Sequence, residues 1–159
     1  MKNRIAKQLG VIITLSFLGS GLAAESLHKI LMEIQGRLER IGVHSQPLRL
    51  NRERLALYHY IGDKIHSFQK TYHLGAGFLD DVSAHLIKAF PEAGCFGKAN
   101  LASMLEFALC YPDLNAVPEV FYVSWKHHCS LIERAIDTDE RLSLIRLSIE
   151  KGWTSKQLE

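Results

Sequence analysis

Histidine and aspartate side chains recur along one stretch of the chain at spacings that suggest metal binding. His59, Asp63 and His66 lie within residues 51–72, where apolar residues recur at helical spacing, and His73 continues the seven-residue step. Seven residues of α-helix span about 10 Å, whereas a metal ion holds its ligands at about 2 Å. One ion therefore cannot bind both His59 and His66, although His59 and Asp63 could share one. We expect a solvated or interfacial helix face instead, with no metal or other cofactor.

A second possible chemistry is nucleophilic catalysis by Cys129 beside His128. Adjacent helical residues point about 100° apart, so these two side chains do not form a dyad. Cys95, Cys110 and Cys129 have no CxxC spacing and lie beside apolar residues, which indicates buried free thiols. The chain has no glycine-rich phosphate loop, nucleophile elbow or HExxH helix. The sequence predicts that the protein is not an enzyme.

Basic and polar residues at three places could bind nucleic acid. We expect them to contact backbone phosphates rather than base edges, because phosphate binding needs only positive charge and hydrogen-bond donors. The alternative for the third place is that Trp125 anchors the core and the histidines are its polar neighbours. The candidates are the run Arg49, Arg52 and Arg54, the helix start with Lys98 and Asn100, and the cluster Lys126, His127 and His128.

The arginine run at residues 49–54 is expected near the start of the second of two long helices. Apolar residues from Leu27 to Ile41 step by three and four, which predicts an amphipathic helix with a narrow apolar seam. After an interruption at Pro47, we expect Asn51 to cap a second helix that runs to Tyr72. The two helices predict an antiparallel hairpin.

A pair of shorter helices follows. One is expected over residues 79–89, with Pro91 as its stop, and the other begins near Lys98 after a break at Gly94. This order is typical of a helix-turn-helix as well as of plain helical core. A recognition helix should be basic and polar, and the second helix carries Lys98, Asn100 and Ser103, followed by Glu106.

Further short helices complete the chain. Ser124 can cap one helix, residues 137–140 and 154–157 have capping-box spacing, and Gly152 can end the helix between them. No segment has the pattern of a strand pair. The expected fold is all-α, with a long antiparallel helical hairpin followed by a helix-turn-helix-like pair and further short helices.

Length and charge indicate a single folded domain without a strong overall attraction for nucleic acid. The chain has 159 residues, 47% of them hydrophobic and 23% charged, with a net charge of +2. Lys2, Arg4 and Lys7 account for three of the 19 basic residues, so the rest of the chain carries 16 basic against 17 acidic residues.

Residues 1–24 resemble a secretory signal, with a basic start, an apolar run from Leu9 to Leu18, and small residues suited to cleavage after Ala23. The run is too short for a stable membrane span. The alternative is a poorly packed N-terminal helix, and three cysteines without disulfide spacing suit a reducing compartment. We expect a cytoplasmic protein, with export through a signal peptide cleaved near Ala23 as the alternative.

Several short motifs occur together in a specific order: LYHYIG at 57–62, GFLDDVS at 77–83, AFP at 89–91, SWKHH at 124–128 and GWT at 152–154. In these motifs the chain from Glu25 to Glu159 resembles the N-terminal domain of the YhcG-like family of bacterial PD-(D/E)xK nuclease proteins. Full-length members carry a C-terminal nuclease domain. We expect residues 25–159 to be the helical domain alone, truncated before any nuclease domain.

The resemblance implies a non-catalytic helical domain that binds DNA weakly or serves as the recognition part of a split or decayed nuclease. Where relatives carry polar or basic residues, this chain has Gly97, Ala99 and Leu105, which weakens the case for DNA contact by the second helix. The rival hypothesis is an interaction module, in which the seam at residues 27–41 and the histidine-bearing helix form a homodimer or dock a separate nuclease subunit. Salt-dependent DNA binding would discriminate the two.

Overall fold

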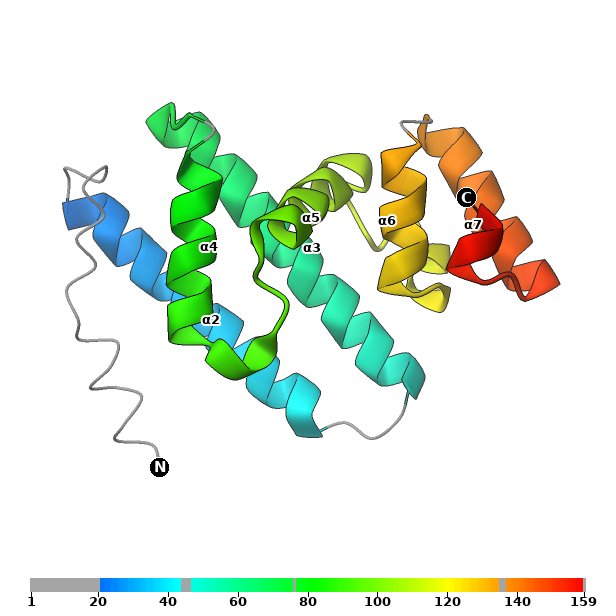
Figure 1. Cartoon of the computed structure of the whole chain (residues 1–159), viewed down its shortest axis with the longest axis horizontal. Coiled ribbons are helices and arrows are strands. Elements are labelled where there is room, and N and C mark those ends of the chain that lie inside the picture. The colour runs from blue at the N-terminus through cyan, green and yellow to red at the C-terminus, as the bar shows by residue number, and fades with distance from the viewer. Residues whose placement is uncertain (1–20, 44–46, 76, 135–136, 159) are drawn as a thin grey trace.

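The computed structural model describes residues 21–43, 47–75, 77–134 and 137–158, and these residues form helices and short connections without a strand. The prediction of an all-α fold is confirmed. Figure 1 shows α2 and α4 on the left, α6 and α7 on the right, and α3 running diagonally through the middle, where α5 crosses it. The helices are α2 (Gly21–Val43), α3 (Pro47–Tyr72), α4 (Phe78–Ala89), α5 (Lys98–Cys110), α6 (Trp125–Glu133) and α7 (Thr138–Lys151), with 3₁₀-helices η1 (Pro91–Ala93), η2 (Pro118–Tyr122) and η3 (Ser155–Leu158).

The signal-like segment lies almost entirely outside this description, because residues 1–20 are not among the described residues. Within the described part of the chain, no helix combines the length and the apolar composition that crossing a membrane requires.

Helices α2 and α3 form the hairpin that the apolar periodicity predicts, with Leu31 and Ile34 buried in the seam. The prediction that Asn51 caps the second helix is wrong, because α3 begins at Pro47. Proline suits the first turn, where its ring presets φ and its missing N–H would have no helical partner. Asn51 instead lies within α3, and its Nδ2 donates to the carbonyl oxygens of Phe121 and Val123, each at 2.9 Å. These two hydrogen bonds hold the start of α3 against η2.

Helices α3 and α5 cross at Gly62, where the two backbones approach closely. A Cβ atom at this position would overlap the carbonyl group of Met104 and lie 3.0 Å from the backbone nitrogen of Leu105. Only glycine allows this approach. The main apolar core forms around the crossing and includes Ile61, Leu101 and Met104, all nearly inaccessible to solvent.

A second apolar cluster lies at the C-terminal side of the crossing. Phe107 from α5, Val120 from η2, Leu131 from α6 and Ile145 from α7 are fully buried in it. Trp125 packs against both clusters and so joins the two halves of the core. The prediction that Trp125 anchors the core is confirmed.

The cap signals of α7 are confirmed, whereas Ser124 occupies the cap position of α6 without a side-chain hydrogen bond to the helix amides. The Asp137 carboxylate accepts a hydrogen bond from the Glu140 amide at 2.8 Å at the start of α7. Gly152 ends α7 with a φ of 64°, the left-handed conformation that favours glycine. The Gln157 side chain accepts from the Thr154 amide at 2.8 Å, although the element that follows is the short η3 rather than an α-helix.

Candidate nucleic-acid interface

A hydrogen bond between two candidate regions brings the N-terminal ends of α5 and α6 together. The indole Nε1 of Trp125 donates to Asn100 Oδ1 at 2.7 Å. Asn100 is itself fixed, because its Nδ2 donates to the carbonyl oxygen of Cys95 at 2.7 Å. Asn100 and Trp125 are 25 positions apart in the chain, so this hydrogen bond joins the start of α5 and the SWKHH segment into one surface.

Neither helix end on this surface has a side-chain cap on its backbone amides. Gly97 occupies the cap position of α5, and Ser124 that of α6. The Ser124 hydroxyl bonds to Nδ1 of His127 at 2.8 Å, so it is engaged by a side chain rather than by the helix amides. The first-turn amides carry the partial positive charge of the helix dipole, which favours an anion in front of them.

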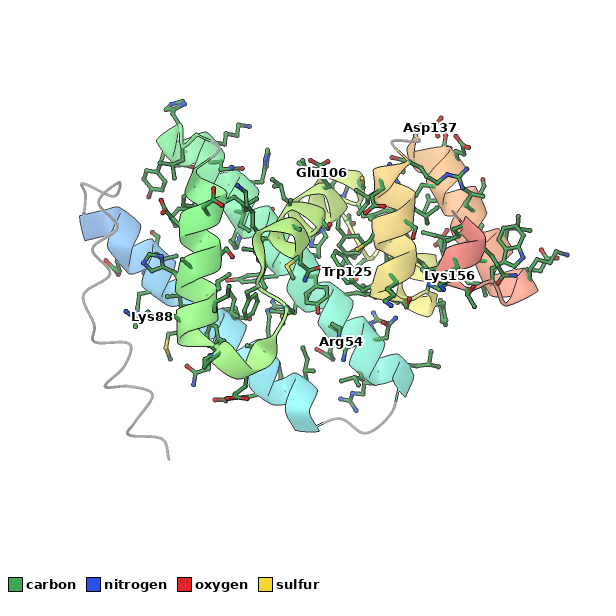
Figure 2. The ribbon with its side chains drawn as sticks, viewed as in Figure 1. Arg54, Lys88, Glu106, Trp125, Asp137 and Lys156 are labelled. Carbon is green, nitrogen blue, oxygen red and sulfur yellow. The ribbon has the colours of Figure 1, made fainter. Side chains whose placement is uncertain are left out.

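Arg54 of α3 lies on the same side of the molecule. It stands one turn before Tyr58, whose ring packs edge-on against Trp125 with ring centroids 4.8 Å apart. Figure 2 labels Arg54 and Trp125 in the middle of the view. Burial raises the pKa of Tyr58 to about 12, and the positive charge of Arg54 opposes that rise. Arg54 therefore acts electrostatically on the residues beneath this surface.

The arginine run of α3 is divided between two faces. Arg52 lies with its guanidinium carbon 4.7 Å from the centroid of the Phe121 ring, on the η2 side. Arg54 is two residues further along, and two residues of α-helix correspond to a rotation of about 200°. Arg49 is exposed in the first turn of α3. The structure thus groups Arg54, but not Arg52, with the ends of α5 and α6.

Ion pairing distinguishes the candidate cations from one another. Lys98 Nζ forms an ion pair with Asp80 Oδ2 of α4 at 2.8 Å, so its charge is partly balanced. In the part of the chain that the structure describes, the other four basic candidates form no ion pair within 4.0 Å. These four are Arg49, Arg52, Arg54 and Lys126, all of them exposed.

The adjacent histidines occupy different environments. His127 bridges two segments, since its Nε2 contacts the carbonyl oxygen of Trp153 at 2.8 Å. His128 is fully buried, and its Nε2 donates to the carbonyl oxygen of Val120 at 2.9 Å. A phosphate in solvent cannot reach the His128 ring. His128 therefore contributes to the packing beneath the site and not to ligand contact.

The burial of His128 predicts that the protein loses stability in mild acid. Burial lowers the pKa of His128 from 6.5 to about 4. Above pH 6.5 the ring is neutral in both the folded and the unfolded protein, so its contribution to the free energy of unfolding is fully present. Between pH 6.5 and 4 the unfolded chain takes up a proton that the folded chain excludes, so the free energy of unfolding falls by up to about 1.4 kcal/mol per pH unit.

Urea unfolding at pH 7.5, 6.5, 5.5 and 5.0 measures this effect. The variant His128→Gln should show a smaller decline over the same range, and the difference between the two proteins isolates this ring from the other titrating groups. Parallel declines would contradict the assignment.

Helix α5 presents a poor surface for reading bases. Its most exposed side chains are Lys98, Ala99, Glu106 and Leu109, and its apolar face packs on α3. One cation, one carboxylate and two apolar side chains offer few donors for base edges. The helix-turn-helix-like pair is present, but α5 does not have the surface of a sequence-reading helix.

His59 and the three cysteines, which have side chains suited to metal binding and catalysis, are all partly buried. The described residues contain no group of three or more histidine, cysteine or acidic residues that could hold a metal ion. His59 is engaged elsewhere, with its Nε2 2.8 Å from the carbonyl oxygen of Tyr111. The three cysteines are free and half-buried, and burial raises the pKa of each thiol, which disfavours the reactive thiolate.

Two features of the site were not predicted from the sequence. The Asn100–Trp125 hydrogen bond joins residues far apart in the chain, and no local pattern reports it. The Asn51 link to η2 has a weak local signal, because an asparagine inside an amphipathic helix needs polar partners if it is partly buried.

Comparison with known proteins identifies a family for most of the chain. The family model described as DUF1016 N-terminal domain matches residues 40–159. This match confirms the resemblance to the N-terminal domain of the YhcG-like family. No curated protein and no solved structure matches the chain.

Proposed function

Because the chain belongs to the DUF1016 N-terminal domain family, we propose that it is a non-catalytic helical domain that binds nucleic acid weakly or serves as the recognition part of a nuclease. The contacts are to backbone phosphates. The observation that carries this proposal is the Asn100–Trp125 hydrogen bond, which brings two uncapped helix ends together. We call the surface formed by Arg54, Lys98, Asn100, Lys126 and His127 the phosphate surface.

The electrostatics of the phosphate surface support this proposal. Both helix dipoles place partial positive charge at their N-terminal ends, where backbone amides can donate to phosphate oxygens. Lys126 and Arg54 add full charges that no carboxylate among the described residues neutralises within ion-pair distance. With the rest of the chain nearly neutral, this local concentration of charge favours weak binding without sequence preference.

The substitution Lys126→Glu tests the phosphate surface. Lys126 is exposed in the first turn of α6, where a glutamate suits the helix dipole, so the fold should be retained. We expect the affinity for a short DNA to fall roughly tenfold at low salt, because one attraction to phosphate becomes a repulsion.

The matched control is Lys88→Glu, an equal charge change at an exposed residue of α4 outside the phosphate surface. Fluorescence anisotropy with labelled DNA measures both variants. If both lower the affinity equally, only net charge matters and the phosphate surface is not the site.

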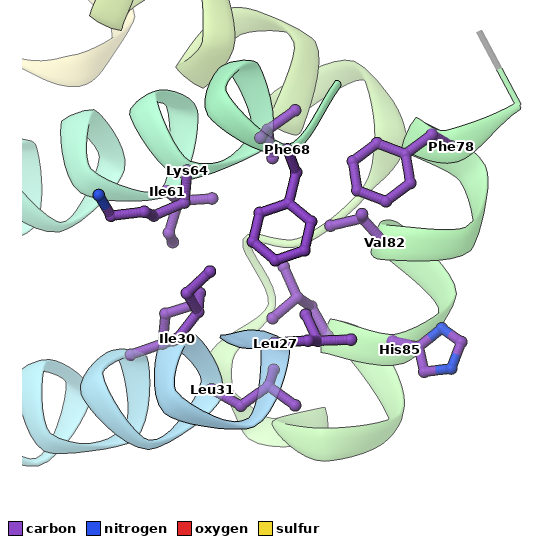
Figure 3. Close-up of a pocket in the computed structure, with 12 residues that line it drawn as sticks. Leu27, Ile30, Leu31, Ile61, Lys64, Phe68, Phe78, Val82 and His85 are labelled. Atoms are coloured by element: carbon purple, nitrogen blue, oxygen red, sulfur yellow. The ribbon is translucent and has the colours of Figure 1, made fainter. Parts of the chain in front are cut away.

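A second candidate function, from a different class, is an interaction module that forms a homodimer or docks a separate nuclease subunit. The observation that favours it is an apolar crevice of about 40 Å³ between α2, α3 and α4. Figure 3 shows Leu27 and Ile30 of α2, Phe68 of α3 and Val82 of α4 around this crevice. Met32 of α2 is exposed as well.

Sedimentation over a wide range of protein concentrations distinguishes this alternative. Self-association that Met32→Glu abolishes would support the interaction module. A monomer at every concentration, without a co-purifying partner, would count against it.

The proposed nucleic-acid binding also fits a cytoplasmic location, which we propose over export. The mass of the intact purified protein decides between them. A chain that starts at Met1 agrees with this location, whereas a chain that starts at Ala24 or Glu25 contradicts it.

A further inference from the structure

A polar cleft lies on the face of α3 opposite the phosphate surface. It has a volume of about 350 Å³ and lies between α2, α3, η2 and the loop at residues 112–115. This volume is within the range of about 300 to 1,000 Å³ that is usual for pockets that hold small organic groups. We call it the arginine cleft, because Arg37 of α2 and Arg52 of α3 line it.

Each arginine of the cleft lies over an aromatic ring. The Arg37 guanidinium carbon is 4.5 Å from the centroid of the Tyr60 ring, and that of Arg52 is 4.7 Å from the centroid of the Phe121 ring. The ring covers one face of each guanidinium and leaves the other face available. Arg37 Nε donates to Glu33 Oε1 at 2.9 Å, so part of its N–H edge is occupied, whereas Arg52 forms no ion pair among the described residues. The cleft thus contains two planar, positively charged groups that are held in place by protein rings.

Hydrogen-bond acceptors lie in the same cleft. Asp63 and Asp113 both line it. Asp113 Oδ1 accepts from the Asn115 amide at 2.9 Å, which orients the carboxylate. The Asp63 carboxylate is paired with Lys64 at 3.0 Å. With two arginines and two aspartates, the lining has no net charge, so it does not attract a phosphate strongly by itself.

A nucleobase matches this combination of groups. Bases released from a helix stack on aromatic rings and on guanidinium planes, and their amino groups donate to carboxylates. In a duplex these faces and edges are stacked and paired, so a paired base cannot enter. We infer that the arginine cleft holds an unpaired base, so that the domain prefers single-stranded nucleic acid to a duplex.

This inference rests on the proposed function, because the phosphate surface must first attract the strand. Arg49, Arg52 and Arg54 all lie in the N-terminal turns of α3. A strand that crosses these turns therefore reaches the phosphate surface on one side and the arginine cleft on the other. The phosphate surface supplies the attraction, and the cleft supplies the preference for unpaired bases.

Fluorescence anisotropy at low salt with three labelled probes of equal length tests the inference. The probes are a 12-nucleotide single strand, its duplex, and an abasic strand with the same backbone. We expect the full chain to bind the single strand about tenfold more tightly than either other probe, since stacking on a protein platform stabilises each base substantially.

Substitutions at Arg52 connect this preference to the cleft. Arg52→Ala should reduce the affinity for the single strand to that for the abasic strand. Arg52→Lys keeps the positive charge but removes the planar guanidinium, so it should lower the affinity for the single strand in the same way. Lys88→Ala on α4 should leave the affinities for all three probes within about twofold of those of the unsubstituted protein.

The outcomes separate the two proposals. Equal affinity for the single strand and the abasic strand, or full binding by Arg52→Lys, would overturn the base site and leave the phosphate surface standing. If none of the three probes binds, the proposed function itself is wrong.

Discussion

Replacing Gly62 with alanine is expected to lower the free energy of unfolding by about 3 kcal/mol. The added Cβ would overlap the Met104 carbonyl group where α3 crosses α5. Because the obstructing atoms are backbone, no side-chain rotation relieves the overlap, and the two helices must move apart. That movement would loosen Leu101 and Met104, which are completely buried beside the crossing. Urea unfolding followed by circular dichroism measures the effect.

The matched control is Gly36→Ala in α2. A Cβ there meets only the Arg40 side chain, at 3.8 Å. This substitution should be neutral or stabilise the protein by up to about 1 kcal/mol, because alanine is the better helix former. Equal stability of the two variants would show that α3 and α5 do not approach as closely as described.

Replacing Phe107 with alanine is expected to cost about 3–5 kcal/mol. Phe107 is fully buried, and its ring packs edge-on against Trp125, Tyr111 and His128, with centroid distances of 5.4, 5.2 and 4.8 Å. Its loss removes apolar contacts from α5 and leaves a cavity beneath α6. Because Trp125 would lose a packing partner, the variant should also bind nucleic acid less well.

Leu109→Ala provides the control on the same helix. Leu109 is 45% exposed, so its truncation should change the free energy of unfolding by no more than about 0.5 kcal/mol. A loss of less than about 1 kcal/mol for Phe107→Ala would contradict the central position assigned to this ring.

The sequence predicted the helices well because their signals are local. The seam from Leu27 to Ile41 repeats at helical spacing, and the caps at Asp137 and Gly152 depend on neighbouring residues only. Asn51 was misassigned because asparagine commonly caps helices, whereas its partners in η2 are about 70 positions away in the chain. The local cap preference was overridden by a tertiary hydrogen bond.

The site was less predictable, because its arrangement depends on contacts between elements. Helical geometry alone predicts that Arg52 and Arg54 lie on different faces of α3. That Arg52 lines a cleft depends on the packing of Phe121 against it, which the sequence does not reveal. In the same way, the sequence places His127 and His128 together, while the packing of α6 buries the second and leaves the first partly accessible. The Asn100–Trp125 link depends on how α5 and α6 meet.

The salt dependence of DNA binding tests the central claim most directly. If the phosphate surface and Arg49 neutralise about three phosphates, a plot of the logarithm of the binding constant against that of the salt concentration should have a slope of roughly −2 to −3. Titrations of labelled single-stranded and duplex DNA from about 20 to 200 mM salt give this slope. We predict such a slope for the unsubstituted protein and a shallower slope for Lys126→Glu. No binding at the lowest salt, or a slope near zero, would contradict the proposal that this domain binds nucleic acid through its phosphates.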